Sequence, residues 1–157
     1  MNGDLDSINL FKGYTQEENS NTHAFLAFLN FLLHADRRDF FKLLRSFNCG
    51  DVSTANPEDI EIRCLRYDHG TWDGEIYSKR KRWFLAIESK INKIALSPSQ
   101  LRRHRQHIET LLAEYDHARL VLLTPFDADW IVKEYLHGKC GRNIAFLSWG
   151  DVYNLNP

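Results

Sequence analysis

The sequence predicts one α/β domain of mixed α+β type, in which a sheet of four or five strands is flanked by helices. Helical and strand-like segments follow one another in the order α, α, β, β, β, α, β, α, β. The three consecutive strand segments are typical of antiparallel hairpins, whereas strands separated by helices are typical of parallel crossovers. We therefore expect both kinds of pairing in a single sheet.

The N-terminal part contains two predicted helices. In residues 18–34 the apolar side chains recur at the spacing of one helix face, and the inward line runs through positions 18, 22, 25, 29 and 32. A second helix is predicted at residues 37–47, before Asn48-Cys49-Gly50. Residues 51–59 are polar and contain Pro57, which predicts a loop.

The later elements have clearer boundaries. Ser97 suits a helix N-cap and Pro98 the first helical position, so a long helix is expected from there to Tyr115. Asp127 begins a further predicted helix that reaches His137. The predicted strands are residues 60–67, 72–77, 83–90, 120–124 and 144–148.

Length and composition fit one domain over residues 1–157, with a formal net charge of −1. A polyanionic partner would therefore need a local basic patch. Cys49, Cys64 and Cys140 have neither the spacing of a zinc site nor the even number of a disulfide framework. The sequence shows no signal-peptide pattern and no apolar run long enough to cross a bilayer. These features favour a cytoplasmic protein that does not act at a membrane.

The segment WFLAIESKIN, residues 83–92, is an apolar strand that ends in charged residues. Side chains alternate along a strand, so Glu88 and Lys90 share the face of Ala86 and Phe84, while Ser89 points the other way. One interpretation is a surface ion pair at the point where the strand emerges. The other is a polar site at the end of a buried strand.

The preceding hairpin favours the second interpretation. If Arg80 and Lys81 form a two-residue loop, residues whose numbers sum to 161 lie opposite each other, and Asp73 then faces Glu88. Opposed residues have Cβ atoms about 5 Å apart, so two carboxylates there repel each other unless a proton or cation lies between them. Hard oxygen ligands of this kind suit Mg²⁺ or Mn²⁺.

Two helix starts carry polar residues on their inward lines. Glu18 heads the inward line of the first helix, and Gln100 heads the line 100, 104, 108, 111 and 115 of the later one. Each residue also fits a capping box, Thr15-x-x-Glu18 or Ser97-x-x-Gln100, so both interpretations stay open.

Together these residues resemble the PD-(D/E)XK nuclease superfamily. The resemblance is to a branch with an E-N-x-x-T first helix, an IE-x-K-I strand and a QL helix; here these are residues 18–22, 87–91 and 100–101. The segments RLVLLTP (119–125) and IAFLSWGDVYNL (144–155) are also similar to that branch, so the resemblance covers roughly residues 11–155. Thr71-Trp72-Asp73 lacks the proline of the superfamily name.

The resemblance implies a restriction-endonuclease-like core and metal-dependent hydrolysis of phosphodiester bonds. Asp73 and Glu88 would hold Mg²⁺ or Mn²⁺, with the Ser89 carbonyl and Glu18 as further ligands. Lys90 would position or deprotonate the attacking water, and Gln100 would orient that water or Lys90. The substrate would be nucleic acid, with DNA favoured over RNA. Because many relatives cut both strands as pairs, a homodimer is consistent with the resemblance.

Two basic clusters are candidates for nucleic-acid binding, with a solvated charged face as the alternative for each. One is at the hairpin tip and the other follows Gln100, at a helix start that also favours phosphate. His69 and His104 could assist, although lone histidines are more often polar surface residues. The candidate nucleic-acid-binding residues are Lys79, Arg80 and Lys81, with Arg82 beside them, and Arg102, Arg103 and Arg105.

Two other classes of function stay open. The chain could be a nucleic-acid or protein-binding module on the same fold with no catalytic activity, although the presence of Asp73, Glu88 and Lys90 argues against this. A metal hydrolase that does not act on nucleic acid is disfavoured, because no His-rich metal motif is present.

Overall fold

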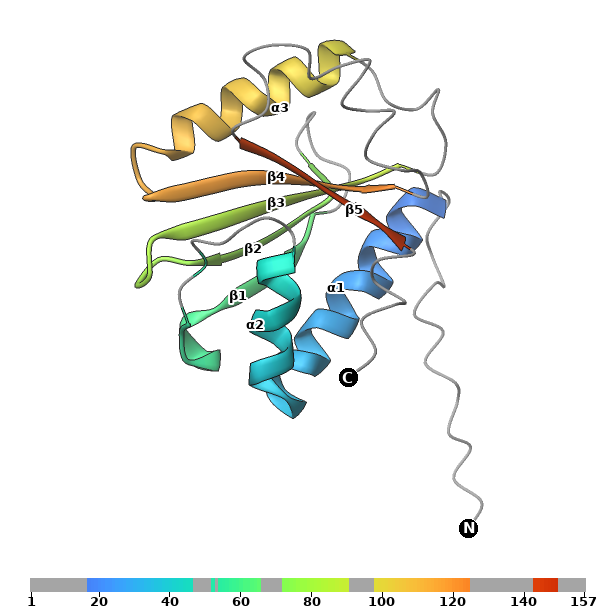
Figure 1. Cartoon of the computed structure of the whole chain (residues 1–157). Coiled ribbons are helices and arrows are strands. Elements are labelled where there is room, and N and C mark those ends of the chain that lie inside the picture. The colour runs from blue at the N-terminus through green and yellow to red at the C-terminus, as the bar shows by residue number, and fades with distance from the viewer. Residues whose placement is uncertain are drawn as a thin grey trace.

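A mixed sheet lies between helices on both of its faces in the computed structural model (Figure 1). The structure describes residues 17–46, 52, 54–65, 72–90, 98–124 and 143–149. The elements are α1 (Glu17–Ala35), α2 (Arg37–Ser46), the 3₁₀ turn η1 (Pro57–Asp59), β1 (Glu61–Cys64), β2 (Gly74–Ser78), β3 (Trp83–Ser89), α3 (Pro98–Leu111), β4 (His117–Thr124) and β5 (Ile144–Ser148).

The sheet has five strands in the order β1-β2-β3-β4-β5. The pairs β1–β2 and β2–β3 are antiparallel, and the pairs β3–β4 and β4–β5 are parallel. The predicted mixed sheet is therefore confirmed. Its parallel half begins at α3, which connects β3 to β4 as a crossover helix.

Most predicted elements are present, with shifted ends. The structure confirms the strand at residues 144–148 and begins β4 three residues earlier than the sequence predicts. The helix α3 ends at Leu111 rather than Tyr115, and the predicted loop at residues 51–59 contains the 3₁₀ turn η1. The predicted helix at residues 127–137 lies outside the described residues. None of the described helices is long and apolar enough to cross a membrane.

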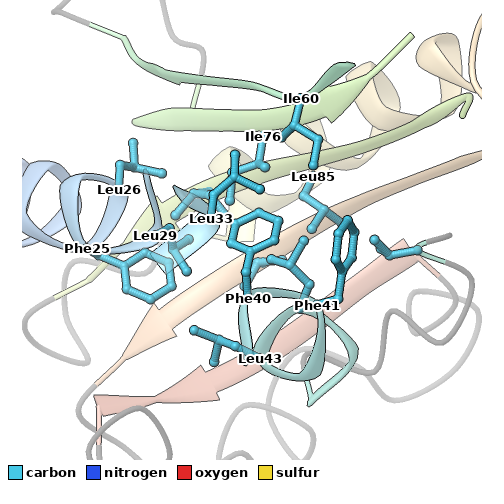
Figure 2. Close-up of a cluster of buried hydrophobic side chains, with 14 of the residues drawn as sticks. Phe25, Leu26, Leu29, Leu33, Phe40, Phe41, Leu43, Ile60, Ile76 and Leu85 are labelled. Atoms are coloured by element: carbon cyan, nitrogen blue, oxygen red, sulfur yellow. The ribbon is translucent and has the colours of Figure 1, made fainter. Parts of the chain in front are cut away.

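One hydrophobic core lies between the sheet and the pair α1–α2 (Figure 2). Leu29, on the predicted inward line of α1, is fully buried there, and Phe40 of α2 packs edge to face against Phe41. Burying each such side chain stabilises the fold by about 1.5–3 kcal/mol. This packing confirms the inward direction of the predicted α1 stripe and fixes α1 across β1, β2 and β3.

A second core lies between the opposite face of the sheet and α3. Strand β3 contributes to both cores, because Leu85 and Ile87 belong to the first and Phe84 and Ala86 to the second. Every residue of β3 is buried. Successive β3 side chains thus point to opposite faces of the sheet, as expected from the sequence. Because β3 is covered on both faces, the residues at its end are also buried.

The β2–β3 hairpin has the predicted register with a longer loop. Glu75 lies opposite Ala86 and Tyr77 opposite Phe84, as the sum of 161 requires. The pairing ends at Ser78 opposite Trp83, so four residues rather than two connect the strands. The Arg82 N–H donates to the Lys79 carbonyl at 3.2 Å, and Arg82 has a φ of 53°. Arg82, in the left-handed conformation, thus closes the four-residue turn, and the register of the two strands stays as predicted.

Candidate active site

The charged end of β3 is buried. Glu88 is 2% exposed and Lys90 is 6% exposed. The Lys90 Nζ lies 2.6 Å from Glu88 Oε1, and the Lys90 backbone N–H donates to the Leu123 carbonyl of β4 at 2.8 Å. The alternative of a surface ion pair is therefore wrong. An ion pair removed from water in this way needs further polar partners to offset its desolvation.

Helix α3 supplies two of these partners. Gln100 Nε2 donates to Glu88 Oε1 at 2.8 Å, and His104 Nε2 lies 3.5 Å from Glu88 Oε2. Gln100 and His104 are four residues apart and so lie on one helix face. The inward direction predicted for Gln100 is confirmed. The placement of His104 as a polar surface residue is wrong, because its side chain is buried beside the Trp72 ring.

The surroundings keep Glu88 ionised. Burial alone would raise the pKa of the Glu88 carboxyl, and it is the largest single influence. The contact with His104 and the positive charge of Lys90 act in the opposite direction and together outweigh burial, so the pKa of Glu88 lies below its ordinary value. The site therefore holds a carboxylate with its charge in the interior of the domain.

Asp73 approaches the same end of β3 along a different path. Its backbone N–H donates to the Ile87 carbonyl at 2.9 Å, although Gly74 is the residue paired with Ile87. Two residues of the β2 segment thus share one partner on β3, which is the arrangement of a β-bulge. The Asp73 carboxylate then accepts a hydrogen bond from the Ser89 N–H at 2.8 Å.

Because of the bulge, Asp73 does not lie opposite Glu88, and that predicted pairing is wrong. Trp72 belongs to the core under α3, whereas the Thr22 hydroxyl of α1 donates to Asp73 Oδ2 at 3.4 Å. A regular strand would have placed Asp73 on the α3 face with Glu75 and Tyr77. The extra residue instead turns the Asp73 carboxylate toward α1. The Glu88 carboxylate is thus contacted by side chains of α3, and the Asp73 carboxylate by a side chain of α1.

These residues could hold a hard divalent cation. Carboxylate oxygens are the preferred ligands of Mg²⁺ and Mn²⁺. Glu88 Oε2 is a buried acceptor that makes no hydrogen bond within the described part of the chain, which leaves it able to bind a cation. Glu18 lies in α1 one turn before Thr22, and its side chain is outside the described residues. Among the side chains that are described, no group of three or more His, Cys, Asp or Glu is arranged to hold a metal ion.

The two predicted basic clusters lie at opposite ends of the central strands. The hairpin tip precedes Trp83, whereas Glu88 and Lys90 lie at the other end of β3, roughly 20 Å away at strand spacing. Arg80 pairs with Asp59 at 3.1 Å, and Arg82 pairs with Asp116 at 2.8 Å. Part of the positive charge at the tip is therefore balanced by neighbouring carboxylates.

The cluster on α3 lies beside the site. Arg102 and Arg103 are exposed and follow Gln100 and Leu101, so they are at the helix end that contacts Glu88. Arg105 is partly buried and pairs with Glu109 at 2.9 Å. The α3 arginines are thus better placed than the hairpin tip to contact a phosphate near Glu88.

Sequence reasoning left Thr22 without a role and gave His104 only an assisting one in nucleic-acid binding, although both lie on the predicted inward helix lines. Their position on those lines was the available signal. Comparisons of the chain with models of protein families, with curated proteins and with solved structures find no significant match. The proposals below therefore depend on the residues of this chain and their geometry.

Proposed function

We propose that the chain is a metal-dependent nuclease that hydrolyses phosphodiester bonds in nucleic acid, with DNA favoured over RNA. The observation that carries the proposal is the contact of Lys90 Nζ with Glu88 Oε1 at 2.6 Å, with Gln100 bonded to the same oxygen. A buried carboxylate–ammonium pair is costly to keep in a domain interior. Such a pair at the end of a central strand, with Asp73 bonded to the intervening Ser89 N–H, is a candidate catalytic site.

Each residue has a distinct role in this proposal. Glu88 and Asp73, with the Ser89 carbonyl and Glu18, would hold Mg²⁺ or Mn²⁺, which when bound polarises the phosphate and lowers the pKa of a coordinated water. Lys90 places an ammonium group beside the reacting phosphate, where it offsets the negative charge that develops there. Gln100 fixes the Glu88 oxygen that also contacts Lys90, so it orients both groups.

The substrate would reach this site over the first turns of α3. Arg102 and Arg103 supply positive charge at the helix end that contacts Glu88, and backbone phosphates bind such residues without regard to sequence. A chain with a net charge of −1 needs a local patch of this kind to retain a polyanion.

The test is cleavage of single- and double-stranded DNA and RNA with Mg²⁺, with Mn²⁺ or with EDTA. The wild type is compared with Lys90→Ala and with the double variant Glu88→Gln/Lys90→Met, which replaces the ion pair by neutral side chains of similar size. Lys42→Ala is the matched control, because Lys42 is exposed on α2. We expect cleavage of DNA that requires the metal, persists in the control and is lost in both site variants.

Three results would contradict the proposal. Cleavage that survives in the folded double variant would show that the activity comes from other residues or from a contaminant. If the wild type binds DNA or RNA and cuts none of the substrates with either metal, the chain is a binding module with a silent site. Hydrolysis of a small phosphoester alone would favour a hydrolase of a different class.

A further inference from the structure

Among the described side chains, His104 of α3 lies beside Glu88 and has no role in the proposed mechanism. It is 2% exposed, and its Nε2 is a buried atom without a hydrogen bond to any described residue. The distance of 3.5 Å to Glu88 Oε2 is just beyond the usual range of about 2.7–3.2 Å for an N–H···O bond. A polar nitrogen kept in the interior at a desolvation cost, and directed at a carboxylate, needs an explanation.

The neighbours of His104 fix its position on the Glu88 side. Leu101 and Ile108 on the same helix are buried in the core under α3, which sets the rotation of the helix about its axis. The Trp72 ring lies 6.2 Å from the His104 ring, between centroids, and belongs to the same core. The imidazole is therefore held between a packed helix and an aromatic side chain.

The partners of Glu88 divide between its two oxygens. A carboxylate offers about four lone-pair sites. Lys90 and Gln100 both contact Oε1, and His104 faces Oε2. Oε2 makes no hydrogen bond within the described part of the chain, so its lone pairs are available to a cation. His104 is the described α3 side chain that faces Oε2, and it is therefore placed to set the direction in which Oε2 is presented.

We propose that His104 is a positioning residue that orients Glu88 Oε2 for the divalent cation of the site. This inference rests on the proposed function and assigns to it a residue beyond the cation ligands, Lys90 and Gln100. Hydrogen-bond partners of metal-binding carboxylates affect metal affinity strongly, and their loss typically weakens it by about 10–100-fold. An N–H donor on α3 at this position should have an effect of that size, whereas an apolar side chain of similar volume should not supply it.

The experiment measures Mn²⁺ affinity by electron paramagnetic resonance without nucleic acid, and DNA cleavage as a function of metal concentration. The proteins are the wild type, His104→Leu, His104→Gln and the control His107→Leu. His107 suits the control because it is exposed on the same helix and contacts the same Trp72 ring, at 4.9 Å between centroids. Thermal unfolding establishes that each variant is folded.

We expect Mn²⁺ affinity to fall at least about tenfold in His104→Leu. His104→Gln should restore most of it, because glutamine keeps an N–H donor of similar reach, and His107→Leu should match the wild type. In cleavage, His104→Leu should need correspondingly more metal for half-maximal activity, with little change in KM for DNA. A role confined to packing would not produce rescue by glutamine.

The outcomes separate this inference from the proposed function. Equal Mn²⁺ affinity in all four proteins would overturn the positioning role, whether or not the wild type cuts DNA. Affinity that depends on His104, without cleavage of any substrate, would overturn the nuclease and support the positioning role. A nitrogen coupling in the Mn²⁺ spectrum that disappears in His104→Leu would make His104 a ligand and overturn positioning. Absence of Mn²⁺ binding to the wild type would overturn both.

Discussion

The carboxylate of Asp73 accepts a hydrogen bond from the backbone N–H of Ser89 at 2.8 Å. Ser89 is the last residue of β3 and lies between Glu88 and Lys90 in the chain, so this bond ties Asp73 to the backbone that carries both charged side chains. It exists because the bulge at Asp73 and Gly74 turns the Asp73 side chain out of the regular β2 pattern. Two carboxylates reach one strand end from opposite layers of the domain.

The Glu88–Lys90 pair should contribute to stability as well as to activity. Removing one partner of a buried pair leaves an uncompensated charge, so Lys90→Ala should lower the free energy of unfolding by about 3–5 kcal/mol. Glu88→Gln/Lys90→Met removes both charges and should cost much less. Urea unfolding of the three proteins tests this expectation. If Lys90→Ala is as stable as the wild type, the pair is more hydrated than its exposure indicates.

The α3 arginines should dominate the salt dependence of nucleic-acid binding. Arg102→Ala and Arg103→Ala should each weaken binding and reduce the slope of log K against log salt by about 1, because each phosphate contact releases a counterion. Lys79→Ala and Lys81→Ala should have smaller effects, since the hairpin tip lies at the other end of β3. Titration of labelled DNA at several salt concentrations measures the slopes. A larger change for the hairpin variants would place the binding path at the tip.

The sequence predicts the sheet and its central hairpin because local patterns determine them. Alternation along residues 83–90 depends only on strand geometry, and the turn at residues 79–82 sets the register of Glu75 with Ala86. The end of β3 as a polar site follows from the same alternation. These are features in which local preference and the final fold agree.

The side of the sheet to which the Asp73 side chain points could not be predicted from the same patterns. The bulge depends on Trp72 packing under α3 and on α1 lying close to Gly74, and both are contacts between segments far apart in the chain. The burial of His104 was missed for a similar reason. Its place on the inward line of α3 was visible, but a lone histidine is more often a polar surface residue, and only the packing of Leu101 and Ile108 decides between the two.

Gly74 should not tolerate a side chain. A Cβ there would overlap Leu26 Cδ1 of α1 and lie 3.1 Å from the Arg63 carbonyl oxygen of β1. Gly74→Ala should therefore destabilise the domain by about 1–3 kcal/mol, as overpacking of a core does. In a Leu26→Ala background the same change should cost less, because the overlapping atom is gone. Thermal or urea unfolding of the four forms gives the coupling, and strict additivity would place the strain at the Arg63 backbone instead.

Tyr77 should make the domain less stable in alkali. Burial, and then its hydrogen bond of 2.7 Å to Glu61 Oε2, raise the pKa of the Tyr77 hydroxyl above its ordinary value. Above about pH 10 the unfolded chain loses this proton while the folded protein keeps it, so stability is fully present below that pH and falls as the pH rises.

Tyr77→Phe removes this ionisation and the hydrogen bond together. The variant should be less stable than the wild type near neutral pH, by about 0.5–1.5 kcal/mol, because Glu61 is exposed and water screens its charge. It should then lose less stability between about pH 8 and about pH 11, which urea unfolding at both values measures. Burial also raises the pKa of Tyr115, so adding Tyr115→Phe should reduce the slope further. Equal slopes for wild type and Tyr77→Phe would mean that the Tyr77 hydroxyl titrates alike in the folded and unfolded chains.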